Sequence, residues 1–138
     1  NNKSKCERYW SKSDEHKIND NWSVKLIHAD DSDSNYIIRR LRLTNSLKNI
    51  DYEFTQFHIT SWPDKSTPTF DNEKLIKISE SWSNQFNEDI KNNSEQDNFV
   101  LIHCSAGCGR TGTLIAIDQM LTYYKQVKFF CLFTKILY

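Results

Sequence analysis

The sequence lacks an excess of charge of either sign, because 18 lysines and arginines balance 18 aspartates and glutamates. Without a basic field, the overall charge does not point to nucleic acid or to an anionic membrane as a partner. The chain also lacks a run of the roughly 18 apolar residues that a membrane span needs. Its nearest approach, VKFFCLFTKILY at residues 127–138, is short and interrupted by Lys128 and Lys135. We therefore expect neither nucleic-acid binding nor a membrane span.

Zinc-binding patterns are also missing. The four cysteines (Cys6, Cys104, Cys108 and Cys131) form no CxxC pair, and the histidines lack finger spacing, so we expect no metal. The opening stretch NNKSKCERYW is polar and does not resemble a secretory signal. We expect reduced thiols in a cytoplasmic protein.

The first half of the chain has the alternation of β-strands. Residues 22–29 (WSVKLIHA), 36–44 (YIIRRLRLT) and 52–60 (YEFTQFHIT) read as strands, separated by the turns DDSDSN and NSLKN. The arginines of the second strand indicate one wet face. Short turns between consecutive strands predict an antiparallel meander.

The second half has helical periodicity. A helix is predicted from about Asp71, with an apolar stripe at Leu75, Ile78, Trp82 and Phe86, followed by a solvated loop at 87–98. The apolar run FVLI at 99–102 predicts a strand buried on both faces. From Arg110 onward apolar residues again recur at helical spacing, at Leu114, Ile117, Leu121 and Tyr124. The pattern predicts an α/β fold in which helices flank a mixed, twisted sheet.

The stretch HCSAGCGRTGT, residues 103–113, joins this predicted strand to the last helix. A glycine-containing loop that opens onto a helix gathers backbone N–H groups and positive helix potential, which together favour an anion. The P-loop of nucleotide-binding proteins is the rival interpretation. It requires Lys before Ser or Thr, whereas Arg110 precedes Thr111 here.

Two side chains give this loop a chemistry. A cysteine at the rim of an anion cradle has a lowered pKa, so Cys104 is expected to be a thiolate near neutral pH. Arg110 supplies a planar fork that matches two phosphate oxygens. The pair predicts phosphoryl transfer through a phosphocysteine. The alternative is a structural cysteine beside a helix-capping loop.

A leaving oxygen needs a proton, which calls for a general acid on a loop that can close. The stretch SWPDKSTP supplies Asp64, which follows Trp62 and Pro63. On its own, Pro followed by Asp is ordinary turn chemistry. Together with the cysteine loop, Asp64 becomes the predicted acid.

These motifs resemble those of the tyrosine-specific protein tyrosine phosphatases. HCSAGCGRTG matches the family's signature loop except at Cys108, where valine or isoleucine is usual, and FHITSWPD at 57–64 resembles the strand and mobile acid loop. Lys5-Cys6 followed by Tyr9-Trp10 resembles another family block. The resemblance implies hydrolysis of phosphotyrosine in proteins during signal transduction, without a metal or another cofactor.

The resemblance also implies a role for each matching residue. Cys104 is the expected nucleophile, Arg110 the phosphate clamp, and Asp64 the acid of the first step and base of the second. Thr111 would stabilise the thiolate, Lys5 would contact the acid loop, and His103 would help set the hydrogen bonds of the signature loop. His58 is expected to be structural. The expected phosphate cradle is the backbone of Ser105, Ala106, Gly107, Cys108 and Gly109 together with Arg110.

The chain departs from the family pattern at both ends. Family segments that hold the phosphotyrosine ring, anchor the arginine and position water have no counterpart, so we interpret 1–127 as a partial catalytic domain and 128–138 as an unrelated apolar tail. Two hypotheses remain open: a protein tyrosine phosphatase, or a fragment that is catalytically impaired or non-enzymatic and at most binds phosphate esters. Cys108 has two interpretations as well, a thiol that fills a valine-sized pocket, which we favour, or a disulfide partner of Cys104.

Overall fold

The structure is a computed structural model that describes residues 8–11, 15–92 and 99–127. Two compact units make up the chain. We call residues 1–70 the sheet unit and residues 71–138 the helical unit. The predictions for Lys5 and for the tail at 128–138 lie outside the described residues.

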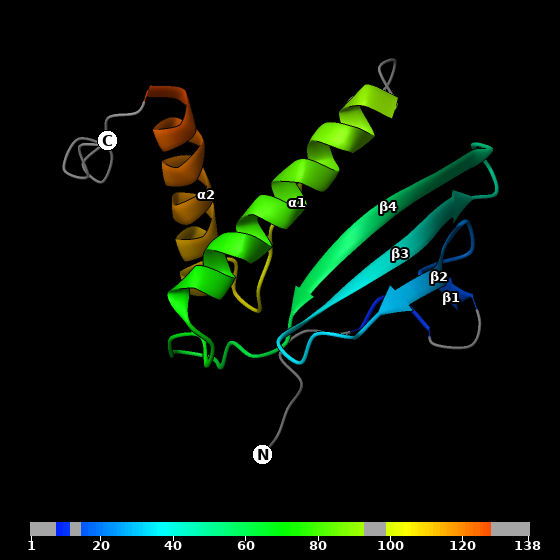
Figure 1. Ribbon diagram of the computed structural model, residues 1–138. Coiled ribbons are helices and arrows are strands. Elements are labelled where there is room, and N and C mark those ends of the chain that lie inside the picture. Colours follow the sequence, from blue (N-terminus) through cyan, green and yellow to red (C-terminus); the bar gives the residue numbers. More distant parts are fainter. Residues whose placement is uncertain (1–7, 12–14, 93–98, 128–138) are drawn as a thin grey trace. The chain divides into compact units, whose positions relative to one another are not determined.

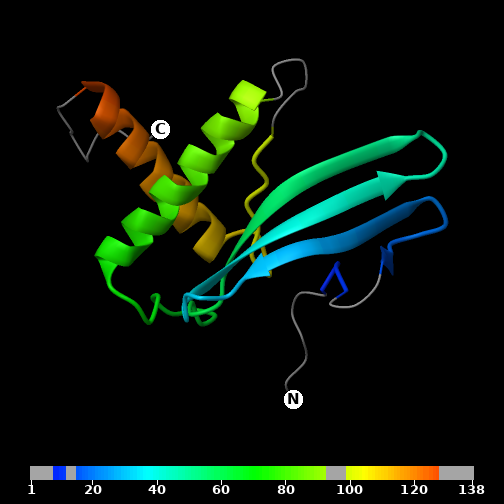
Figure 2. The ribbon, with the colours of Figure 1, turned by 45° about the vertical axis from the view of Figure 1, so that its right-hand side comes forward.

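The sheet unit is an antiparallel meander of four strands in the order β1-β2-β3-β4. Its strands are β1 (His16–Lys17), β2 (Trp22–Asp30), β3 (Tyr36–Asn45) and β4 (Ile50–Ile59). Figure 1 shows β2, β3 and β4 side by side, and Figure 2 shows their twist. The three predicted strands and their order are confirmed, while the two-residue strand β1 gave no sequence signal.

Short polar side chains form the turns of this meander. Asn45 Oδ1 accepts hydrogen bonds from the N–H groups of Leu47 (3.0 Å) and Lys48 (2.9 Å), and Asn49 adopts a left-handed φ of 50°. In the preceding turn, Asp33 Oδ1 accepts from Asn35 N–H at 2.8 Å. Asn and Asp favour such turns because their side chains mimic backbone acceptors and Asn tolerates positive φ. The turn at residues 45–49 joins β3 to β4, whose register runs unbroken from Tyr36↔Ile59 to Asn45↔Ile50, and the turn at residues 33–35 joins β2 to β3.

A small core lies on one face of this sheet. Trp10, Val24 and Leu41 are buried together, and Leu41 is fully inaccessible to solvent. Arg39 is buried on the same face, where its guanidinium lies 4.6 Å from the Trp10 ring centroid. Its Nη1 donates to Gln56 Oε1 at 2.8 Å. A cation over an indole face is favourable, which explains how an arginine is accommodated beside this apolar core.

The opposite face is the wet face that the sequence predicts. Arg40 pairs with Glu53 at 2.9 Å, and Arg42 pairs with Glu53 at 2.6 Å and with Asp51 at 3.5 Å. Strand alternation separates adjacent arginines, because successive side chains point to opposite faces. Arg40 and Arg42 therefore face solvent while Arg39 faces the core.

The helical unit begins with α1 (Asn72–Asn92). Asp71 caps it, because its Oδ1 accepts from Lys74 N–H at 2.7 Å. Of the predicted stripe, Leu75 and Ile78 are buried, and Trp82 and Phe86 are half-buried. The prediction that 87–98 is a loop is wrong for 87–92, where the helix continues. Charged and polar residues form helices readily when one face remains wet, so polarity alone did not mark the end of this helix.

The second helix, α2 (Gly109–Val127), confirms the helix predicted from Arg110. It contacts α1 through a polar group: Asp118 Oδ1 accepts from Ser83 Oγ at 3.0 Å and from Ser79 Oγ at 3.4 Å. At the rim, Lys125 Nζ lies 3.0 Å from Glu80 Oε1. Tyr124 departs from the predicted apolar stripe, since 59% of its surface is exposed.

The predicted strand at 99–102 is not a strand in the structure. Phe99 and Leu101 are 83% and 85% exposed. An apolar run becomes a strand only when neighbouring strands accept and donate its backbone hydrogen bonds, and no such ladder reaches it among the described residues. The α/β class of the chain is confirmed, whereas its described sheet is antiparallel rather than mixed.

Candidate active site

The signature loop connects residues 99–102 to α2. Gly107 adopts a φ of +72°, which glycine reaches without steric cost, and the loop turns there. The first helical hydrogen bond follows directly, from Gly112 N–H to the Cys108 carbonyl at 2.8 Å. Residues 103–108 therefore form a turn that ends at the N-terminus of a helix, as the sequence predicts.

The Cys104 thiol is the most perturbed group at this loop. Its pKa is lowered to about 6, first by a hydrogen bond from the Thr111 hydroxyl, then by hydrogen bonds from the backbone N–H groups of Thr111, Ala106 and Gly107. Desolvation acts in the opposite direction and is outweighed. Donors stabilise the charged form of a thiol more than the neutral form. A thiol with this pKa is mostly ionised at neutral pH.

The Thr111 side chain is buried, and its hydroxyl has no hydrogen-bond partner of good distance and angle within the described ranges. The same hydroxyl is nevertheless the first cause of the lowered pKa of Cys104, so it lies near the sulfur without an aligned hydrogen bond. A buried hydroxyl without an acceptor is unfavourable, and a thiolate at Cys104 is the acceptor toward which it would turn.

Arg110 and His103 flank Cys104 in the sequence. Arg110 Nη2 donates to Ser105 Oγ at 3.0 Å, which holds the guanidinium over the loop. His103 Nδ1 lies 3.4 Å from the Cys104 carbonyl oxygen. The sequence identifies Ser105 only as part of the backbone cradle. Its side-chain contact with Arg110 is an addition from the structure, since no sequence pattern encodes where this hydroxyl points.

Cys108 does not occupy the pocket that we favour from the sequence. Its side chain is exposed, and its Sγ donates to the Ala106 carbonyl oxygen at 3.4 Å. The residue directly precedes α2. A valine-sized pocket is therefore absent there, and the interpretation of Cys108 as a packing residue is wrong for this structure.

The predicted acid loop belongs to the sheet unit. Trp62 is buried and its Nε1 donates to the Ser66 carbonyl at 2.8 Å, while Pro63 and Asp64 are exposed. The loop is closed at its base because both the N–H and the hydroxyl of Thr69 donate to the Ser61 carbonyl at 3.0 Å. No sequence pattern indicates this closure at Thr69.

Asp64 sits at the outer turn of this loop, and Lys65 after it adopts a φ of 57°. A non-glycine residue in the left-handed region costs about 1 kcal/mol. The hydrogen bonds of Trp62 and Thr69 therefore hold the turn that carries Asp64. Its approach to Cys104 during a reaction stays a prediction.

His58, by contrast, is structural. Its Nδ1 lies 3.0 Å from Arg39 Nη1, and its ring meets Trp10 edge to face at 6.1 Å between centroids. These contacts tie β4 to the core of the sheet unit. The sequence prediction for His58 is confirmed.

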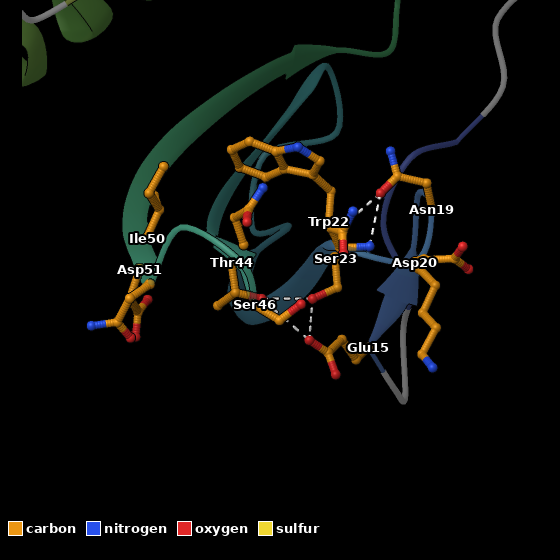
Figure 3. Close-up of a pocket in the computed structure, with 13 residues that line it drawn as sticks. Glu15, Asn19, Asp20, Trp22, Ser23, Thr44, Ser46, Ile50 and Asp51 are labelled. Atoms are coloured by element: carbon orange, nitrogen blue, oxygen red, sulfur yellow. Dashed lines mark hydrogen bonds between the residues drawn. The ribbon is translucent and has the colours of Figure 1, made fainter.

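A pocket of about 450 Å³ opens elsewhere in the sheet unit, beside Trp22 (Figure 3). None of the predicted site residues lines it. Its polar groups are engaged in the turns: Glu15 accepts from Ser23 and Thr44, and Asn19 Oδ1 accepts from Trp22 N–H at 2.9 Å. This arrangement is that of a hydrogen-bonded turn, and we assign no chemistry to it.

Comparison with known proteins identifies the class to which this loop belongs. The family model described as "Protein-tyrosine phosphatase" matches residues 1–136. The chain belongs to the protein-tyrosine phosphatase family. The α/β arrangement of sheet and helices agrees with part of such a domain.

The similar proteins include cellular and viral phosphatases. The human protein "Tyrosine-protein phosphatase non-receptor type 12" is 36% identical over 91% of this chain, which spans 15% of that protein. "Probable tyrosine phosphatase protein H4" of Microplitis demolitor bracovirus (isolate Webb) is 32% identical over 92% of this chain, and the matched region covers 69% of that viral protein. The human protein "Receptor-type tyrosine-protein phosphatase C" is 36% identical over 87% of this chain, and the matched region covers 9% of that human protein.

The relatives therefore include both non-receptor and receptor-type proteins, so similarity does not assign a compartment. Within the described ranges, no helix is both long enough and apolar enough to cross a membrane.

Proposed function

We propose that this chain carries the phosphoryl-transfer site of a protein tyrosine phosphatase. The observation that carries the proposal is the Cys104 thiol, whose pKa is lowered to about 6 by donors from the signature loop and α2. A group with this pKa is ionised at neutral pH and reacts with an electrophile such as phosphorus. Membership of the family supports the same reaction.

In the first step the Cys104 thiolate attacks the phosphorus of a phosphotyrosine. The sulfur–phosphorus bond forms while the bond from phosphorus to the phenolic oxygen breaks, and Asp64 donates a proton to that oxygen. The products are free tyrosine on the protein substrate and a phosphocysteine at Cys104.

In the second step water attacks the phosphocysteine. Asp64, now a carboxylate, accepts the proton of that water, and the sulfur leaves as a thiolate. The Thr111 hydroxyl, which is the first cause of the lowered pKa of Cys104, stabilises this leaving group. Inorganic phosphate is released, and the starting charge state returns without a metal or cofactor.

Charge on the transferring phosphoryl group is the main quantity to stabilise in both steps. Arg110 offers two parallel N–H donors once it leaves Ser105 for phosphate, and the N-terminus of α2 adds positive potential. The backbone N–H groups of Ala106 and Gly107 contribute to the lowered pKa of Cys104. We place Ser105, Cys108 and Gly109 in the same cradle. Lys5, Trp62 and Pro63 are supporting residues of the acid loop in this proposal.

The proposed substrates are phosphotyrosine-containing proteins, because the relatives are named tyrosine phosphatases and the proposed acid suits a phenol leaving group. A cytoplasmic location and a role in signal transduction belong to the same proposal. Residues 1–127 as a partial catalytic domain and 128–138 as a separate tail also remain predictions.

A second candidate function follows from the exposed segment at 99–101. Phe99, Val100 and Leu101 expose 83%, 42% and 85% of their surfaces directly before the nucleophile. Exposed apolar residues leave the loop with little packing support, so the chain could bind phosphate esters weakly without turning them over. A thermal melt of the chain and a measurement of its turnover distinguish the two candidates: a chain that melts cooperatively but does not turn over aryl phosphate is the weak binder.

The deciding experiment is phosphate release over time from an aryl phosphate by the intact chain, with Cys104→Ser as the control. Sustained release that the variant lacks supports the enzyme. A burst of about one equivalent of the aryl alcohol per chain without release of phosphate indicates attack without hydrolysis of the phosphocysteine. Equal rates for both proteins would remove Cys104 from the mechanism.

Asp64→Ala tests the acid separately. The variant should lose more rate with poor leaving groups than with good ones, because only a poor leaving group needs the proton. A series of aryl phosphates with leaving-group pKa values on both sides of phenol measures this dependence. Equal slowing across the series would contradict the assignment of Asp64 as the acid.

A further inference from the structure

The turn at residues 33–35, between β2 and β3, takes no part in the proposed mechanism, yet it lies against the start of the acid loop. Figures 1 and 2 both show the end of β4 beside this turn. The Asn35 carbonyl accepts from Thr60 N–H at 2.8 Å and from Ser61 N–H at 3.3 Å. The Ser34 carbonyl accepts from Ser61 Oγ at 3.3 Å. The turn therefore supplies acceptors to the first residues that follow β4.

Ser61 is held from two sides. Its N–H and its hydroxyl donate to the turn, and its carbonyl accepts from both the N–H and the hydroxyl of Thr69, each at 3.0 Å. Residues 62–68, which include Asp64, lie between these two points of attachment. The place of Ser61 therefore sets where the acid loop leaves the sheet and where it returns.

One carboxylate holds the turn. Asp33 Oδ1 accepts from the backbone N–H of Asn35 at 2.8 Å and from the side-chain Nδ2 of the same residue at 3.2 Å. That Nδ2 also donates to Ser34 Oγ at 3.3 Å. A carboxylate is only an acceptor, and here one oxygen serves a backbone donor and a side-chain donor of Asn35. Both the main chain and the side chain of Asn35 are restrained by Asp33.

The contact of Asp33 also sets the direction of the Ser34 carbonyl. That carbonyl and the Asn35 N–H belong to the same peptide unit, and in a trans peptide the two groups point in opposite directions. With the N–H held by Asp33 Oδ1, the carbonyl faces the other way, and Ser61 Oγ donates to it. Loss of the Asp33 acceptor would remove this restraint on the acceptor that Ser61 uses.

We propose that Asp33 is a positioning residue of the acid loop: by accepting from the backbone and side-chain donors of Asn35, it holds the turn whose carbonyls anchor Ser61. The inference rests on the proposed function, because only there is Asp64 the acid. The alternative is that Asp33 shapes nothing beyond its own hairpin, as aspartates in turns commonly do. The two accounts differ in what they expect at the start of the acid loop.

The experiment is backbone hydrogen exchange of the intact chain, resolved by residue with NMR. Asp33→Ala removes the acceptor, Asp33→Asn keeps an oxygen in its place, and Asp31→Ala removes a neighbouring charge only. We expect Asp33→Ala to speed exchange at Thr60 and Ser61 about three- to tenfold, because each N–H loses a well-placed acceptor. Asp33→Asn should restore slow exchange, and Asp31→Ala should not change it. The Ser46 N–H, which is bonded at the opposite end of β3, should exchange equally in all variants.

A second measurement distinguishes positioning of the acid from damage to the fold. In the proposed mechanism Asp64 protonates the leaving oxygen, so a displaced acid loop slows aryl phosphates with poor leaving groups and spares those with good ones. Asp33→Ala should slow phenyl phosphate roughly threefold and leave dinitrophenyl phosphate nearly unchanged. An intact chain that never releases phosphate would refute the proposed function, while the exchange rates would still decide whether Asp33 holds Ser61.

Two results would overturn the inference. One is unchanged exchange at Thr60 and Ser61 in an Asp33→Ala protein that retains its melting temperature, because Asp33 would then act only within its own hairpin. The other is equal slowing of good and poor leaving groups in that variant, because placement of the acid would then not explain the loss. If Asp33→Ala does not fold, Asn35→Ala replaces it under the same criteria, since it removes the Nδ2 donor and keeps the backbone contact.

Discussion

The two units of this chain support their functional loops in different ways. The sheet unit has a core of its own around Leu41, and its acid loop is closed by Trp62 and Thr69. The helical unit has a polar contact between α1 and α2, and the segment before Cys104 exposes Phe99 and Leu101. Hydrogen bonds hold both loops, but the loop of the proposed acid belongs to a unit with a buried apolar core, whereas the loop of the proposed nucleophile follows an exposed apolar segment.

This difference between the two units shows which properties of the signature loop depend on nearby hydrogen-bond donors and which depend on an apolar core. The lowered pKa of Cys104 needs donors within hydrogen-bond reach, and the residues from 106 to 111 supply all of those identified. Such local chemistry does not require a large core. Stability does, because burial of apolar area is the main favourable contribution to folding.

The largest expected effect is on the core of the sheet unit. Leu41→Ala should lower the free energy of unfolding by about 2–5 kcal/mol, because Leu41 is fully buried and its loss leaves a cavity. Urea denaturation followed by tryptophan fluorescence measures the change.

Leu101→Ala is the matched control for this prediction. With 85% of its surface exposed, Leu101 should change stability by less than about 0.5 kcal/mol. A loss at Leu101 comparable to the loss at Leu41 would break the comparison, because it would place a hidden partner over residues 99–101.

The second effect concerns the contact between α1 and α2. Asp118→Ala should cost about 1–3 kcal/mol, since buried Ser79 and half-buried Ser83 lose their acceptor. Lys125→Ala removes the exposed pair with Glu80 and should cost less than about 1 kcal/mol. Thermal melts of both variants test the ranking. The reverse order would show that the rim pair, not the Asp118 group, holds the helices together.

The smallest effect is on reactivity rather than stability. Thr111→Val should raise the pH midpoint of iodoacetamide alkylation at Cys104, followed on the Cys104 peptide by mass spectrometry, by about one pH unit, because the Thr111 hydroxyl is the largest cause of its lowered pKa. Thr113→Val is the control, because the Thr113 hydroxyl donates to the Gly109 carbonyl in its own helix at 2.9 Å. Equal shifts in the two variants would contradict the specific role of Thr111.

The same pKa gives stability a pH dependence of known sign. Folded Cys104 ionises near pH 6, while an unfolded thiol ionises near pH 9. Unfolding between these values takes up a proton, so this group's contribution is fully present above about pH 9 and is lost as the pH falls through about 6. The pH dependence of unfolding should be weaker in Cys104→Ser across this window.

Local patterns predicted much of this molecule. Alternation identified β2, β3 and β4, periodicity identified both helices, and the spacing of cysteine and arginine identified the signature loop. The sequence-based predictions were wrong where contacts with other parts of the chain determine the local structure. FVLI has the composition of a strand but has no ladder, and Cys108 has the size of a core residue but is exposed.

The directions of side chains within the loops could not be predicted from the sequence either. The contact of Ser105 with Arg110 and the closure of the acid loop by Thr69 depend on rotamers that a loop sequence does not encode. The role of Thr111 was predicted because the family resemblance supplied it, and the structure adds its burial beside the thiol.

The most direct test of the central claim is to trap the phosphocysteine. The intact chain is mixed with a phosphotyrosyl peptide, quenched at short times, digested, and the Cys104 peptide is weighed by mass spectrometry. We predict a species heavier by one phosphoryl group on Cys104, absent from the Cys104→Ser protein. Release of phosphate without this species at any quench time, or with the same rate in Cys104→Ser, would contradict the account.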